Sequence, residues 1–385
     1  MTALLFCSLS FPGAACAEGA LETSQIINEQ FERLNIGELE SFIKKIDQDL
    51  NSQLSGFSLQ GLLERIRSGR LDFNLTNVIK TLLDFLFRQL LTHLSLLGEL
   101  LVLGTALALL EQLQSAFEQN TVARLAHGIG VLCLLTVALS SFTLALNTGR
   151  EAIGNMVGLM HSILPVLLTL MAGMGNLTTV ALIHPVVFVS LNIFGALTRN
   201  IVFPLIFCAA ILGIINHISE RFQVSRLADL LRDGSVILTT LFLTLFVGIL
   251  GVQGVAGAVS DGIGLRTAKF LTGAFVPVVG GVLSDAVEAI MGCSLFLKNA
   301  VGILGTLIIF FMCALPGIKI LSVAAIYRLA AALMEPLGAH RLGGSLTLLG
   351  NYLFVVFAGV AAVGLMFFIA LTIVVGVGNF SVLLR

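Results

Sequence analysis

The sequence is poor in charged residues and contains no tryptophan. Charged residues make up 11% of its 385 residues, whereas hydrophobic residues make up 57%. A globular protein in water has about 25% charged residues, and it cannot bury this much apolar surface, because some surface always remains exposed. The mean hydropathy of +1.02 therefore indicates that lipid surrounds most of the chain.

Catalytic and phosphate-binding motifs are also missing. The patterns HExxH, GxSxG, GxxxxGK[ST] and GxGxxG do not occur, which argues against the enzyme classes that depend on them. The six cysteines include no CxxC pair, so the sequence predicts neither a metal site nor a disulfide framework. The net charge of -1 provides no basic surface for nucleic acid. We therefore expect no enzyme activity, no cofactor and no nucleic-acid partner.

Residues 1–17 have the features of a secretory signal peptide. An apolar stretch from Ala3 to Phe11 precedes a Pro-Gly break, and Ala15-Cys16-Ala17 supplies the small residues of a cleavage site. No Lys or Arg precedes the apolar stretch, and the alternative is that Cys16 is a lipoprotein cysteine. Cleavage after Ala17 predicts that the next segment lies outside the cytoplasm.

The next segment, 18–85, is polar and has the pattern of amphipathic helices. Apolar residues recur at steps of three and four between Phe31 and Leu50, with acidic and basic residues between them. Such helices cover their apolar faces against a membrane or a partner, or they form a dedicated docking module. We expect a small helical extracytoplasmic region here.

From residue 86 onward the sequence is a succession of apolar stretches, and about 20 such residues suffice to cross a membrane. The pattern predicts an all-α polytopic membrane protein with eight to ten transmembrane helices, of which the first two lie in 86–153. The predicted crossings are 86–110, 125–146, 156–174, 177–197, 201–218, 235–259, 268–284, 289–309, 313–330 and 346–377.

The basic residues predict the orientation of these crossings. Arg150-Glu151 follows the second predicted crossing and would lie outside. The stretch 219–234 follows the fifth and contains Arg221, Arg226 and Arg232, so the positive-inside rule places it in the cytosol. The count from an external N-terminal region gives the same side.

The body also contains signs of a tandem duplication. Two pairs of prolines share one spacing, and two Gly-Ser pairs each open a long apolar stretch. This predicts two copies of a four-crossing unit, residues 154–259 and 268–377, and the second copy lies in the region 260–385 that also includes the C-terminus. An even number of crossings makes the copies parallel. Prolines inside crossings should also kink their helices. The matched residues are Pro165 with Pro277, Pro204 with Pro316, and Gly234-Ser235 with Gly344-Ser345.

Five charged residues are the main candidates for a function inside the membrane, where charge is costly and often functional. They either line a wet pore or pair with other groups and snorkel to the interface. Two carboxylates three positions apart share a helical face, so they form a proton relay or flank a crossing at the interface. The candidates are Glu99, Asp285, Glu288, Lys298 and Lys319.

Two long stretches resemble the stage III sporulation protein AE family of endospore-forming bacteria. They are GREAIGNMVGLMHSILPVLLTLMAGMGN and LADLLRDGSVILTTLFLTLFVGILGVQG. The resemblance rests on Gly149-Arg150, Ala152-Ile153, Pro165, Pro204 and the basic stretch before Gly234-Ser235, and it extends from about residue 20 onward.

The resemblance implies a multi-pass protein of the mother cell, in the membrane that surrounds the engulfed forespore. It implies membership of the stage III assembly, which works with stage II sporulation protein Q from the forespore side to link the two compartments and sustain late forespore gene expression. It implies no catalytic residue.

Two hypotheses of function follow. The first is a non-enzymatic component of a transmembrane conduit, either its membrane platform or a pore-lining subunit. The alternative is a self-sufficient secondary transporter with a site at the repeat interface, for which Lys298 and Lys319 would be suitable. An intramembrane enzyme is disfavoured because no catalytic spacing is present.

Overall fold

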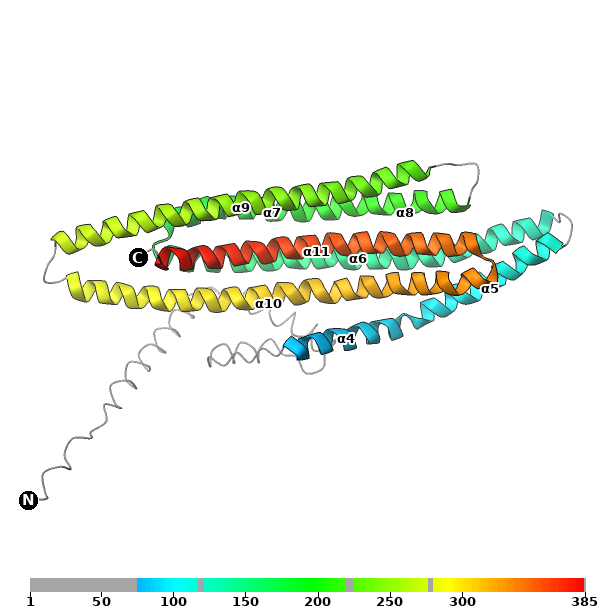
Figure 1. Ribbon diagram of the computed structural model, residues 1–385, viewed down its shortest axis with the longest axis horizontal. Coiled ribbons are helices and arrows are strands. Elements are labelled where there is room, and N and C mark those ends of the chain that lie inside the picture. The colour runs from blue at the N-terminus through cyan, green and yellow to red at the C-terminus, as the bar shows by residue number, and fades with distance from the viewer. Residues whose placement is uncertain (1–74, 117–120, 219–223, 276–279, 384–385) are drawn as a thin grey trace, which may run out of the picture.

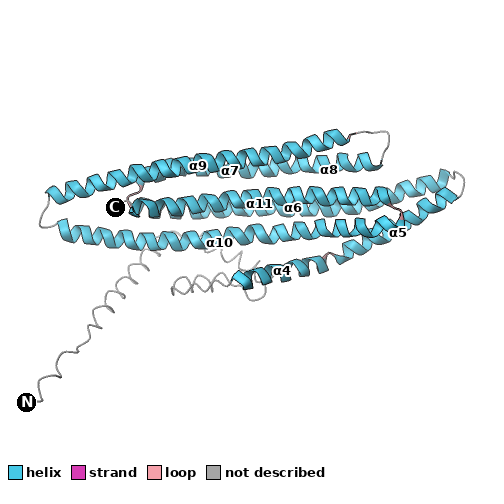
Figure 2. Ribbon diagram, viewed as in Figure 1, coloured by secondary structure: helices cyan, strands magenta, loops and turns pink. Residues whose placement is uncertain are grey.

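The computed structural model describes residues 75–116, 121–218, 224–275 and 280–383. All regular structure in these ranges is helical, as predicted (Figure 2). The elements are α4 (Leu75–Thr92), α5 (Leu94–Ala116), α6 (Thr121–Gly173), α7 (Leu177–Leu197), a π-helical turn η1 (Thr198–Val202), α8 (Phe203–Ile218), α9 (Ser225–Phe275), α10 (Gly280–Met334), a 3-10 turn η2 (Glu335–Leu337) and α11 (His340–Leu383).

Several helices are much longer than a membrane crossing requires. α6 has 53 residues and α10 has 55, so at 1.5 Å per residue each is about 80 Å long. Five helices of the described residues are long and apolar enough to cross a membrane, or six if the bent pair α4 and α5 forms one span.

The predicted eight to ten crossings are therefore not confirmed. The stretches 125–146 and 156–174 lie in the single helix α6, and 289–309 and 313–330 lie in α10. The polar residues between these stretches suggested loops. However, Arg, Glu and Asn do not break a helix as a proline or glycine turn does. Arg150-Glu151 accordingly lies halfway along α6 instead of in an external loop.

Two of the turns depend on glycine. Gly175, between α6 and α7, and Gly338, between η2 and α11, have φ angles of 83° and 86°. Only glycine adopts this left-handed conformation without a steric cost. In the second turn Pro336 is the second residue of η2, which favours the end of α10 because proline cannot continue a helix's hydrogen bonding.

The helices form an elongated bundle in which the chain runs back and forth (Figure 1). α10 packs against α11 and α6, and α9 packs against α7, α8 and α11. α6 is buried along one flank, with Met156, Leu159 and Ile163 inaccessible to solvent. α9 instead exposes a stripe that includes Ile237 and Leu241.

The helices run alternately toward the two ends of the bundle. α5, α8 and α10 end, and α6, α9 and α11 begin, at the end on the right of Figure 1. α6, α9 and α11 end at the other.

Some of the predictions fall on residues that the structure does not describe or only partly describes. The predicted signal peptide and the head up to residue 74 lie outside the described residues, and so does Pro277. The predicted boundary between residues 85 and 86 falls within α4, where Phe85 is only 2% exposed and belongs to the core of the bundle. The first bundle helix therefore begins before that boundary.

Candidate functional site

A polar cleft lies halfway along α6, where that helix faces η1 and the start of α8. Its volume is about 700 Å³. Polar side chains line almost all of it, although the adjoining parts of both helices are apolar. The lining residues are Asn147, Arg150, Glu151, Arg199, Asn200 and Pro204.

The backbone of η1 positions Arg199 in this cleft. The chain runs from α7 through the π-helical turn into α8 without leaving a helical conformation. Arg199 Nε donates a hydrogen bond to the Gly195 carbonyl at 3.3 Å, and Thr198 Oγ1 donates to the Phe194 carbonyl at 2.9 Å. Pro204 follows two residues after η1 and has no backbone N–H, so it cannot donate to the helical hydrogen bonding next to this turn. Single π-helical turns inside α-helices are frequent at functional sites.

Gly154 on α6 makes room for the Arg199 side chain. A Cβ atom at this position would lie 3.2 Å from Arg199 Nη1, so any larger residue would press on the guanidinium. The Arg199 side chain thus reaches the surface of α6 at Gly154, and it lines the same cleft as Arg150.

The two guanidinium groups of the cleft lack carboxylate partners. Among the described residues the ion pairs are those of Arg232 with Asp229 and Asp233, and neither Arg150 nor Arg199 takes part. Arg150 Nε is buried and has no hydrogen-bond partner. A buried donor without a partner costs about 1–3 kcal/mol, so this cleft favours an anionic or accepting group.

The cleft belongs to a charged layer that crosses the middle of the bundle. A Cβ atom at Gly149 would lie 3.2 Å from both Phe203 and Val360, which brings α6, α8 and α11 to one level. Gly317 of α10 meets Phe357 of α11 at the same height. Lys319, two residues further along α10 and half-buried, therefore lies in the layer as well.

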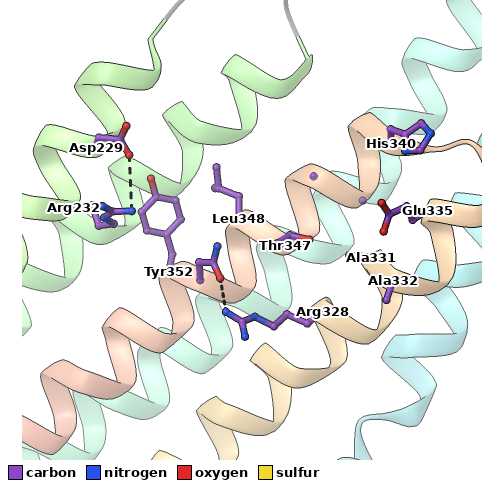
Figure 3. Close-up of a pocket in the computed structure, with 13 residues that line it drawn as sticks. Asp229, Arg232, Arg328, Ala331, Ala332, Glu335, His340, Thr347, Leu348 and Tyr352 are labelled. Carbon is purple, nitrogen blue, oxygen red and sulfur yellow. Dashed lines mark hydrogen bonds and ion pairs between the residues drawn. The ribbon is translucent and has the colours of Figure 1, made fainter.

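A second polar pocket, of about 650 Å³, lies nearer the α10–α11 turn (Figure 3). Its basic groups already have partners. Arg328 Nη2 donates to Asn351 Oδ1 at 2.6 Å, and its guanidinium carbon lies 4.5 Å from the Phe354 ring centre. Arg232 Nη2 lies 2.9 Å from Asp233 Oδ1. Both arginines of this pocket are therefore already paired.

Asp261 near the opposite end of α9 caps the start of α7. Its carboxylate oxygens accept hydrogen bonds from the backbone N–H groups of Thr178 and Thr179, both at 2.9 Å. The Asp261 side chain is buried, with 4% of the residue exposed. The first N–H groups of a helix have no partner within it and carry partial positive charge, so the carboxylate satisfies both requirements.

The predicted intramembrane residues whose side chains the structure describes do not form a common site. Lys298 is 0% exposed, and its Nζ donates to the Val375 carbonyl at 2.8 Å. Lys319 lies 21 positions further along α10, or about 30 Å along the axis. Glu99 is exposed on α5. Asp285 and Glu288 fall in α10, but their side chains lie outside the described residues.

Three of the four prolines predicted to kink helices lie among the described residues. Pro165 and Pro316 lie inside α6 and α10, which continue past them. Pro204 is the second residue of α8. Pro185 inside α7 was not among the predicted kink positions.

Sequence reasoning missed Arg150, Arg199 and Asp261 as site residues. Each stands between two apolar stretches and was assigned to a connection, because charged residues usually mark the ends of crossings. Arg150 did contribute to the family resemblance, and this was the available signal. No group of three or more potential metal ligands occurs among the described side chains.

Comparisons with known proteins show the family of the chain. Its residues 57–378 match the stage III sporulation protein AE family. Stage III sporulation protein AE of Bacillus subtilis (strain 168) is 41% identical over 328 residues, which cover 85% of this chain and 82% of that protein. No solved structure matches the chain. The relatives indicate a role in sporulation, and the apolar helices fit a multi-pass membrane protein. The chain belongs to the stage III sporulation protein AE family.

Proposed function

We propose that this protein is a non-enzymatic membrane subunit of a conduit that links the mother cell and the forespore during sporulation. The observation that supports it is the family match, which spans nearly all of a bundle with five or six candidate spans. Its partners would be the other stage III sporulation proteins and, indirectly, stage II sporulation protein Q. Through that complex it would sustain late forespore gene expression.

The proposed location is the mother-cell membrane around the forespore, with the N-terminal region outside the cytoplasm. In the bundle α8 ends and α9 begins at the end towards which α4 and α5 run (Figure 1). With the N-terminal region outside, that end is cytosolic. The same end carries Arg226, Arg328 and Arg341, and the positive-inside rule favours this orientation.

We also retain the tandem duplication as a hypothesis. Pro204 lies in α8 and Pro316 in α10, while Gly234-Ser235 lies near the start of α9 and Gly344-Ser345 near the start of α11. Each copy would then contribute one helical hairpin to the bundle, α7 to α9 in the first and α10 to α11 in the second. Two passes per copy keep the copies parallel.

The test of the proposed function is partner co-purification from sporulating cells after deletion of residues 18–74. This deletion keeps the predicted signal peptide and leaves α4 intact, because Phe85 of α4 is part of the core. We expect the truncated protein to reach the membrane, to lose stage III partners and to block late forespore gene expression. Unchanged co-purification would contradict a docking role for the N-terminal region.

The double substitution Lys298→Met and Lys319→Met separates the conduit subunit from the secondary transporter. Methionine preserves the length of both side chains and removes both charges. A conduit platform keeps its partners and supports sporulation with this variant. A transporter with a substrate site at these lysines keeps its partners but loses transport and sporulation. The separation of Lys298 and Lys319 along α10 does not favour one shared site.

A further inference from the structure

On one side of the mid-bundle charged layer, α6, α7, α9, α10 and α11 contain no Asp, Glu, Lys or Arg over a common length, whereas α4 carries the exposed Lys80 and Asp84 on that side. Each charge-free segment has about 20 residues or more, equivalent to at least about 30 Å of helix, which matches the hydrocarbon thickness of a bilayer. Contacts of Gly257 with Thr179 and of Gly302 with Val375 confirm that the segments lie side by side. They are 152–173, 177–198, 234–260, 299–318 and 360–383.

The outer surface of this half is apolar. Large hydrophobic side chains are exposed on α7, α9 and α10, among them Phe188, Ile249 and Phe310. On the other side of the layer, α9 to α11 expose Asp229, Arg328 and further charged residues. α5 and α6 also expose apolar side chains on that other side, among them Leu109 and Leu132. The charges on α9 to α11 are therefore what favours hydrocarbon around the first half, with its edge at the level of Arg150 and Arg199.

The cleft between α6 and η1 lies at this edge and has the chemistry of a phosphate site. Arg150 and Arg199 have no carboxylate partner among the described residues, and the amides of Asn147 and Asn200 add neutral donors at its exposed rim. Glu151 is also exposed there, so the two guanidiniums outnumber one carboxylate. A planar guanidinium binds phosphate oxygens in a bidentate manner.

We propose that this cleft binds the phosphate of an anionic membrane lipid, with Arg150 and Arg199 as its ligands. The exposed side chains of Val189 and Ile193 lie one to three turns from Arg199 on the charge-free side, where they offer an apolar surface to the acyl chains. Basic pockets between transmembrane helices bind anionic headgroups in this way. Inorganic phosphate would bind the same two guanidinium groups, but it has no acyl chains to contact the apolar surface.

The test is lipid binding to the full-length protein in detergent, measured by native mass spectrometry. The probes are phosphatidylglycerol, phosphatidylcholine and inorganic phosphate. We expect phosphatidylglycerol to bind in preference to phosphatidylcholine. The double variant Arg150→Gln and Arg199→Gln should weaken phosphatidylglycerol binding by about tenfold or more.

The matched control removes two exposed cations elsewhere, by Lys80→Gln and Arg226→Gln, and should change binding by less than about twofold. An equal loss in the control, or no loss in the cleft variant, would overturn the proposal. Displacement of the lipid by equimolar inorganic phosphate would assign the site to free phosphate and overturn the lipid assignment. Equal, arginine-dependent binding of phosphatidylcholine would overturn the requirement for an anionic lipid.

A conservative variant distinguishes the loss of a lipid ligand from misfolding of the protein. Arg199→Lys keeps the charge but loses the bidentate geometry, so it should weaken phosphatidylglycerol binding by about threefold without altering the melting temperature. Binding as tight as that of the unchanged protein would contradict a ligand role for Arg199.

Discussion

At the scale of single residues, the polar groups that stabilise the bundle join segments that are far apart in the sequence. Asp261 on α9 holds the first turn of α7, Lys298 on α10 bonds to the Val375 carbonyl of α11, and the Tyr327 hydroxyl donates to the Ala138 carbonyl of α6. In a bundle whose helices are apolar on most faces, such contacts fix the register that hydrophobic packing alone leaves open.

The Asp261 cap gives a prediction for stability. Asp261→Asn retains one acceptor oxygen and loses the negative charge at the helix N-terminus, so we expect a loss of about 1–2 kcal/mol in the free energy of unfolding. Asp261→Ala leaves both N–H groups without an acceptor and should cost more. The measurement is unfolding of the detergent-solubilised protein by heat or SDS. Asp233→Asn, at an exposed site on the same helix, is the control and should be nearly neutral.

Single residues were only partly predictable. The sequence left Lys298 either lining a wet pore or paired with another group, and the structure buries it against α11 with its Nζ on the Val375 carbonyl. The roles of Asp261 and Arg199 were not predictable, because their partners Thr178 and Gly154 are defined by how α6, α7 and α9 pack, and no local spacing encodes that packing.

At the scale of elements, the turns were more predictable than the helix lengths. Gly175 and Gly338 stand where the apolar pattern stops, and their positive φ angles are what glycine supplies. The helices are longer than predicted because hydropathy detects a change from apolar to polar, whereas a helix ends only where its backbone hydrogen bonding ends. Around Arg150 the sequence changes from apolar to polar, but α6 continues through this segment.

The contact of α7 with α9 gives a second prediction from a matched pair of glycines. A Cβ atom at Gly257 would lie 2.8 Å from the Cα atom of Thr179, whereas one at Gly251 would meet nothing within 4 Å. Gly257→Ala should therefore push the helices apart and destabilise the protein by about 1–3 kcal/mol. Gly251→Ala should stabilise it by up to about 1 kcal/mol through helix propensity. Equal effects of the two substitutions in SDS unfolding would contradict this packing.

At the scale of the whole molecule, composition predicted the helical membrane class. The number of crossings could not be counted from hydropathy, and the order of the helices explains why. Two apolar stretches separated by charges have the same profile whether they form a hairpin or one long rod. The packing of α6 beside α10 and α11, which no sequence window contains, selects the rod.

The absence of tryptophan allows a direct test of where hydrocarbon surrounds the bundle. Val189 and Ile201 are 52% and 47% exposed, and they lie about 18 Å apart along the helix axis. We expect Val189→Trp to be quenched strongly by lipids brominated near the bilayer centre and weakly by aqueous iodide. Ile201→Trp should give the reverse order. Identical quenching of both would show that the charged layer does not mark the membrane boundary.

The unbroken length of α10 between Gly280 and Met334 has a mechanical consequence. A stiff rod about 80 Å long acts as a lever, so a tilt of about 5° at one end displaces the other by about 7 Å. A force applied where α10 meets α11 would thus be felt at the opposite tip, and Pro316, which lacks a backbone N–H inside α10, is the position at which the helix would bend.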